Sequence, residues 1–207
     1  MRTDSYTAEA ICQSMGLPSF DHDPACLRAA AALRLLLKPS FHPEICLTFL
    51  DGKVSVVSAR FMIWRQFEPS PMLTDRAEGS IPGDAFAALL ASTAPATKPG
   101  GVPGIMIDGM PSDLLCFGGG EIVLKAGGNA GRKGDYSSFV GLAITTAWGC
   151  IANPHCRNSL ADAAEYVGTK LPRDPEPARK PTVETMVLGA EEDRTQVLEA
   201  LRKLHGG

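Results

Sequence analysis

Four side chains in this sequence are of the types that perform acid–base or nucleophilic chemistry: His42, Asp108, Cys116 and Glu121. A histidine can act as a general base, a carboxylate can orient it, and a thiolate can attack a substrate. Such chemistry requires these groups to lie within hydrogen-bond reach of one another. No sequence motif contains two of these four residues at a spacing typical of a catalytic site. Turn formation and structural hydrogen bonding are therefore the alternative roles, and the sequence predicts no assembled catalytic site.

A glycine-rich segment, residues 126–135, stands between a predicted strand and a predicted helix, where a phosphate-binding loop would lie. Its spacing matches neither GxxxxGK[ST] nor GxGxxG. Arg132 and Lys133 could still hold an anion together with backbone N–H groups. The alternative is a basic surface loop without a ligand.

Six cysteines are scattered along the chain. Cys150, His155 and Cys156 lie close together, but they lack the CxxC or HxxxH spacing of a zinc site. The first residues do not show the pattern of a secretory signal, which is an apolar stretch followed by a cleavage site. We therefore expect a cytoplasmic protein with reduced thiols. We expect neither a metal nor a cofactor.

Composition restricts the class of protein. With 207 residues, 44% of them hydrophobic and 21% charged, the chain can form a globular core. A net charge of −3 argues against a nucleic-acid binder that works through a basic surface. The longest uncharged stretch, residues 136–152, is shorter than the roughly 20 residues of a spanning helix. We therefore expect no membrane segment there and interpret the stretch as a buried helix.

The clearest fold signal is a hairpin of residues 45–50 and 54–60, joined by Asp51 and Gly52. Asp-Gly is typical of a two-residue type I′ turn, which sets Leu50 opposite Lys53 and Phe49 opposite Val54. This register places the alternating apolar residues on one face. The alternation fails after Ser58, which predicts a bulge or a strand end there.

Other periodic segments complete an α+β fold with a mainly antiparallel sheet of about five strands packed by several helices. A helix is predicted after the N-cap Asp23, extending through Leu37. Ile122 and Leu124 are expected to point inward from their strand. The remaining predicted strands lie near 105–108, 114–117 and 121–125, and the remaining helices near 7–15, 84–90, 137–151 and 159–167.

The chain changes character near its end. Residues 1–168 are predicted to form a single α+β domain, residues 169–182 a Pro-rich connector, and residues 183–207 a strand-helix appendage. Val197 and Leu201 belong to an apolar stripe of the appendage helix. That stripe must bury against the protein's own body or against a partner.

Two function classes remain. The first is a cytoplasmic protein-binding protein, for example an immunity or inhibitor protein that neutralises a cognate toxin or enzyme. An acidic chain suits a basic protein partner, and a homo-oligomer is compatible with the same pattern. The alternative is a small hydrolase or transferase whose site is assembled from residues distant in sequence. The missing catalytic motif favours the binding protein.

Overall fold

The computed structural model describes residues 6–50, 52–63, 72–96, 109–131 and 134–177. Two compact units divide the chain, Met1–Glu176 and Pro177–Gly207, and the description below concerns the first. The helices in the described residues are all too short, or too polar, to cross a membrane.

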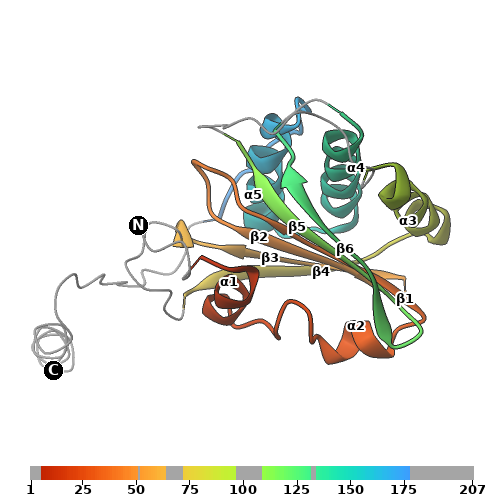
Figure 1. Cartoon of the computed structure of the whole chain (residues 1–207). Helices are drawn as coiled ribbons and strands as arrows, with labels where there is room; N and C mark the ends of the chain where they lie inside the picture. The colour runs from red at the N-terminus through yellow and green to blue at the C-terminus, as the bar shows by residue number, and fades with distance from the viewer. Residues whose placement is uncertain (1–5, 51, 64–71, 97–108, 132–133, 178–207) are drawn as a thin grey trace, which may run out of the picture. The chain divides into compact units, whose positions relative to one another are not determined.

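One antiparallel sheet of six strands forms the centre of this unit, in the order β4-β3-β2-β1-β5-β6. Helices cover both of its faces, with α1 and α2 on one side and α3, α4 and α5 on the other (Figure 1). The α+β prediction is confirmed, with six strands in place of about five. The strands are β1 (Ala31–Leu37), β2 (Ile45–Leu50), β3 (Lys53–Ala59), β4 (Thr74–Ser80), β5 (Pro111–Gly118) and β6 (Glu121–Asn129).

The predicted hairpin is present with its predicted register. Phe49 pairs with Val54, and Leu50 pairs with Lys53. Gly52 has a φ of 71°, as the tight turn requires. The strand β3 ends at Ala59, where the alternation of the sequence fails.

The predicted helix from Asp23 to Leu37 is wrong over most of its length. Asp23 does cap a helix, α2 (Pro24–Arg28), but the chain then becomes the strand β1. β1 pairs with β2 on one side and with β5 on the other, and both of its faces are buried. An unbroken apolar run fits a two-sided buried strand as well as a buried helix, and periodicity alone does not separate them.

The sheet separates two apolar layers. Leu33, Leu35 and Leu37 point toward α3, α4 and α5, whereas Ala32 and Leu36 point toward α1 and α2. The alternating side chains of the strands β1, β2, β3 and β5 supply both layers. Central strands buried on both faces make the sheet a rigid support for the side chains at its rim.

Helices are present at the four remaining predicted positions, but α3 extends six residues beyond its predicted end at residue 90, and two helices begin earlier than predicted. The α4 helix begins after Gly134, earlier than its predicted serine cap, and α5 begins after the N-cap Asn153, earlier than Ser159. Asn153 accepts a hydrogen bond from the Cys156 backbone, which fixes the earlier start. The helices are α1 (Ala8–Ser14), α3 (Gly83–Ala96), α4 (Asp135–Cys150) and α5 (Pro154–Tyr166).

The first part of the Pro-rich segment runs along α5. Asn158 donates to the backbone of Asp174 at 2.9 Å and accepts from its N–H at 2.8 Å. His155 contacts Glu176 at 2.8 Å. Residues 171–176 therefore belong to the compact unit that ends at Glu176.

Candidate binding site beside β6

The two outer strands of the sheet differ in character. β4 carries Asp75, Arg76 and Glu78 within seven residues, and charges of this kind protect an edge from pairing with another chain. β6 is nine residues long, begins Glu-Ile-Val-Leu-Lys, and is partly or fully exposed along its length. In the described part of the chain no strand pairs with its outer side. β6 is thus the longer of the two edges and the one with fewer charges.

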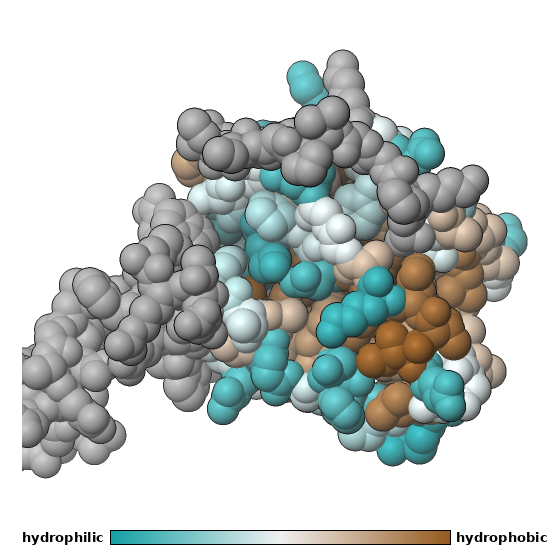
Figure 2. Space-filling view, in the orientation of Figure 1, coloured by the Kyte–Doolittle hydropathy of each residue, from teal (hydrophilic) through white to brown (hydrophobic). Residues whose placement is uncertain are grey.

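A bulge in β6 brings apolar side chains to the surface. Leu124 pairs with Cys116 and Ile122 pairs with Phe117, so Val123 is one extra residue in the strand. Val123 is 65% exposed and Ile122 is 37% exposed. The prediction that Ile122 points inward is therefore wrong, because the bulge resets the alternation, while Leu124 packs on the core as expected. Figure 2 shows hydrophobic side chains gathered on this side of the body.

Beside this apolar surface lies a pocket of about 390 Å³, the α1 pocket, between the start of α1 and the strands β5 and β6. Its floor is the sheet and its rim is the loop before α2. It is lined by Thr7, Ala8, Glu9, Ser19, Phe20, Asp21, Asp113, Leu114, Leu115, Lys125 and Ala126.

Three carboxylates border the α1 pocket, against one lysine of the lining, Lys125. Glu9 accepts hydrogen bonds from the Ser19 hydroxyl and the Phe20 backbone. Asp21 accepts from His22 and shares the Ser19 hydroxyl proton with Glu9, and these bonds lower the pKa of its carboxyl. Asp113 pairs with Lys38 at 2.7 Å. The balance of charge around the pocket suits a cationic group.

A wholly buried arginine supports the rim of the pocket. Arg34, on β1, donates to the carbonyl oxygens of Ser19 at 2.5 Å, Phe20 at 3.1 Å and Pro18 at 3.1 Å. Its guanidinium also lies 3.6 Å from Asp23 and 5.4 Å from the Phe20 ring centroid. A guanidinium presents several donors in a rigid plane, so one side chain holds residues 18–20 of the connection between α1 and α2 against the sheet.

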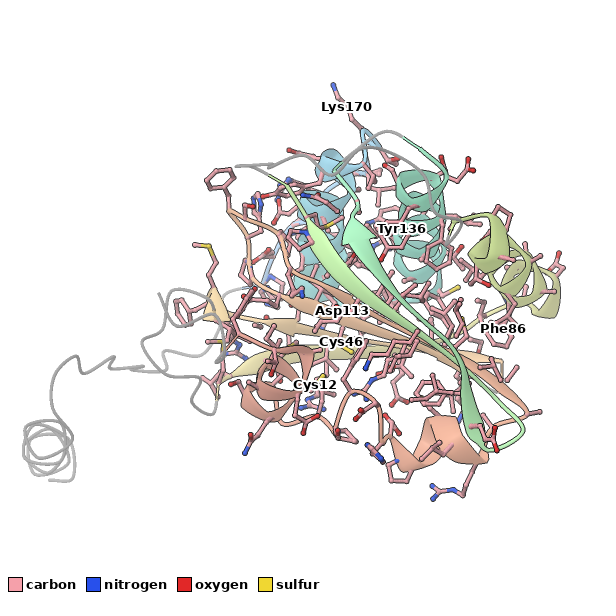
Figure 3. The ribbon with its side chains drawn as sticks, viewed as in Figure 1. Cys12, Cys46, Phe86, Asp113, Tyr136 and Lys170 are labelled. Carbon is pink, nitrogen blue, oxygen red and sulfur yellow. The ribbon has the colours of Figure 1, made fainter. Side chains whose placement is uncertain are left out.

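Two thiols share this buried position. Cys12 on α1 contacts Cys46 on β2, and Figure 3 shows the two labels next to each other. The hydrogen bond from Cys12 and the charge of Arg34 lower the pKa of Cys46 to about 7, although burial opposes the shift. The pKa of Cys12 is raised, first by its bond to Cys46 and then by burial. Cys46 is thus the thiol that ionises first.

We expect Cys46 to make the stability of the protein depend on pH. A group whose pKa is lower in the folded state stabilises that state above its unfolded pKa, near 9, and loses this effect as the pH falls through about 7. Urea denaturation from pH 9 to pH 6 should show a decrease that Cys46→Ser removes. Absorbance at 240 nm should follow the thiolate over the same range. Cys156→Ser is the control, because it removes a buried thiol elsewhere, and an equal flattening in both variants would contradict the assignment.

Of the four side chains considered as catalytic candidates, His42 has the most structured surroundings. Its Nδ1 lies 3.1 Å from the Tyr166 hydroxyl, and its Nε2 lies 3.8 Å from Asp162. The Phe41 backbone N–H donates to the same hydroxyl at 3.0 Å. Asp162 also pairs with Arg173. These contacts tie the β1–β2 connection to α5, which is a structural role.

The structure does not bring the other catalytic candidates to His42. Cys116 is buried opposite Leu33 in the middle of β1, and burial raises the pKa of its thiol. Glu121 lies at the β5–β6 turn, beyond the Ala31 end of β1, whereas His42 follows the Leu37 end. The six residue steps of the strand place those two about 20 Å apart. Asp108, Arg132, Lys133, Val197 and Leu201 lie outside the described residues.

Sequence reasoning did not identify the residues of the α1 pocket. Glu9, Asp21 and Asp113 are far apart in the chain, and each looks like an ordinary surface charge. One signal was present: Arg34 is the single charge within the apolar run of residues 29–37. A charged side chain in a strand that is buried on both faces must pair with other groups inside the protein.

Comparison with protein-family models, with curated proteins and with solved structures finds no match to this chain.

Proposed function

We propose that this protein is a cytoplasmic protein-binding protein, of the kind that an immunity or inhibitor protein represents, and that it docks its partner on β6 and the α1 pocket. The observation that carries the proposal is the juxtaposition of an outer strand whose far side pairs with no described strand, two exposed apolar side chains and an acidic pocket. The six cysteines, all reduced thiols, support the cytoplasmic location.

The arrangement fits strand addition. An extended segment of the partner would pair its backbone with β6, while alternate side chains contact Ile122 and Val123. A lysine or arginine of that segment would enter the α1 pocket between Glu9, Asp21 and Asp113. The net charge of −3 favours the approach of a basic partner.

The enzymatic alternative, a hydrolase or transferase, has one observation in its favour, the contact of His42 with Asp162. Neither residue lines the α1 pocket. The other candidates, Cys116 and Glu121, lie elsewhere in the sheet. The binding function is therefore the better supported of the two.

Photo-crosslinking tests the proposal directly. A photoreactive amino acid at position 123, in the full chain expressed in its own cells, should crosslink one partner. The same residue at Leu142, which is 40% exposed on α4, is the matched control and should not. In addition, Asp113→Lys in the crosslinking chain should reduce the yield at least fivefold, because it places a cation at the pocket.

Equal crosslinking from positions 123 and 142 would contradict docking on β6. A partner that crosslinks at position 123 and tolerates Asp113→Lys would leave strand addition in place and remove the role of the pocket. Absence of any crosslinked protein across growth conditions would count against a protein-binding function.

A further inference from the structure

Two thiols meet between α1 and the sheet. Cys12 comes from α1 and Cys46 from the start of β2, and both belong to the apolar layer that faces α1 and α2. The two side chains are hydrogen-bonded to each other, and Figure 3 labels both. We call them the thiol pair. A bond between its two sulfurs would join a helix to the middle of the sheet.

The strand register brings a positive charge to the thiol pair. Arg34 on β1 lies opposite Thr48 of β2, two residues beyond Cys46. Residues two apart in a strand share a face, so Arg34 and Cys46 are diagonal neighbours, within reach of a long side chain. The guanidinium lies 4.0 Å from the Cys12 sulfur and also contacts Cys46. Both sulfurs therefore lie beside one buried cation.

This cation has a donor to spare for a thiolate. Its two Nη atoms donate to the carbonyl oxygens of residues 18–20. The Nε of Arg34 is buried and has no hydrogen-bond partner among the described residues. A buried N–H is normally paired, and an ionised Cys46 supplies an acceptor and a counter-charge. Thiolates, and not thiols, react with peroxides, so Cys46 is the more reactive member of the pair.

We propose that Cys46 is a modification site for hydrogen peroxide and that Cys12 is its resolving thiol, so that peroxide joins α1 to β2 through a reversible disulfide. The nucleophile, the cation beside it and the second thiol are all in place in the reduced protein. This inference does not depend on the proposed docking function.

The chemistry takes two steps. The Cys46 thiolate attacks one oxygen of hydrogen peroxide, so that an S–O bond forms, the O–O bond breaks and hydroxide leaves; the product is a sulfenic acid. The Cys12 sulfur then attacks the Cys46 sulfur, an S–S bond forms, and the hydroxyl group leaves with the Cys12 proton as water. Two electrons pass from the thiol pair to the peroxide. A dithiol reductant reverses the reaction by thiol–disulfide exchange.

Burial controls the rate of this reaction. Cys12 is 0% exposed and Cys46 is 2% exposed. The cover over both is α1, a helix of seven residues, and a short helix opens locally at lower cost than a central strand. Peroxide is close to water in size, so a brief opening of α1 admits it. We therefore expect oxidation that is slower than that of an exposed thiol but confined to this pair.

Peptide mapping of the full chain tests the proposal. The reduced protein is treated with hydrogen peroxide, its free thiols are blocked with N-ethylmaleimide, and the unreduced digest is analysed by mass spectrometry. The peptide pair linked through Cys12 and Cys46 should be the main product, and dithiothreitol should remove it. Its rate of formation should increase severalfold from pH 6 to pH 8, because the pKa of Cys46 is about 7.

Single substitutions separate the two roles. Cys12→Ser should stop the reaction at a sulfenic acid on Cys46, which dimedone traps. Cys46→Ser should leave Cys12 unmodified. Cys156→Ser is the matched control, because it removes a buried thiol of α5, and it should form the same disulfide at the same rate.

The disulfide should also change the stability of the protein. It closes the loop between residues 12 and 46, which should raise the melting temperature by roughly 5–10 °C. The oxidised protein has no Cys46 thiol to titrate, so the pH dependence of stability expected for the reduced protein should disappear. An oxidised protein with an unchanged melting temperature and the same pH dependence would contradict a bond at this position.

Three results would overturn the proposal. The first is a yield of the Cys12–Cys46 link no greater than that of other cysteine pairs. The second is oxidation of Cys12 in Cys46→Ser at the rate seen in the unsubstituted chain. The third is the recovery of all six thiols unmodified from the folded protein, under conditions in which peroxide oxidises the same chain in urea.

Discussion

Replacing Arg34 with alanine should lower the free energy of unfolding by about 3–5 kcal/mol, the range found when a buried, paired charge is broken. For a unit of this size that corresponds to a decrease in melting temperature of roughly 10 °C. Arg34 has no exposed surface and donates to three consecutive backbone carbonyls, those of residues 18–20. Its removal leaves these carbonyls without donors and leaves Asp23 without its buried counter-charge.

Urea denaturation at pH 7.5 measures this change. Arg28→Ala is the control, because Arg28 is an exposed arginine of α2 and its loss should cost less than about 0.5 kcal/mol. A loss below about 1 kcal/mol in Arg34→Ala would show that water replaces the guanidinium. In that case the connection between α1 and α2 would not depend on Arg34.

The substitution Gly79→Ala should be about as disruptive, costing about 3 kcal/mol or more. A Cβ on Gly79 would lie 1.9 Å from the carbonyl oxygen of Cys150 and 2.6 Å from its carbonyl carbon. Both are backbone atoms, so no rotamer change relieves the clash, and β4 has to move away from the end of α4. Overpacking of this kind commonly costs 1–3 kcal/mol, and more where the backbone must shift.

Gly83→Ala is the matched control, since a Cβ there meets no atom within 4 Å. Its stability should be unchanged or up to about 1 kcal/mol higher, because alanine favours the helix α3. Thermal melting of both variants side by side decides the matter. Equal stabilities would mean that β4 and α4 separate at little cost.

The parts of the fold that sequence reasoning predicted are those with a local physical cause. The Asp51-Gly52 turn determines its own register, and Asp23 is a cap whose side chain bonds the next turn. β1 was misassigned because an apolar run carries no period when both faces are buried. β4 was missed because its outer face is polar, so it lacks the alternation of apolar residues by which a strand is recognised.

The candidate sites were harder to predict, since their residues meet only through the fold. Glu9 and Asp113 line the same pocket because α1 and β5 lie side by side there, which their spacing in the sequence does not reveal. The exposure of Val123 depends on one extra residue in β6 relative to β5.

The strand order has a consequence for folding. β1, β2, β3 and β4 follow one another in the chain and pair as neighbours, whereas the β5–β6 hairpin returns from far along the chain to pair with β1. Closing that long loop costs entropy before its contacts form. The four-strand meander should therefore form first. During refolding, the amides of β5 and β6 should be the last in the sheet to become protected from exchange with solvent. The β5–β6 hairpin, which is also the surface proposed to bind a partner, would then be the last part of the sheet to fold. A partner that binds this surface would stabilise the hairpin in its folded position.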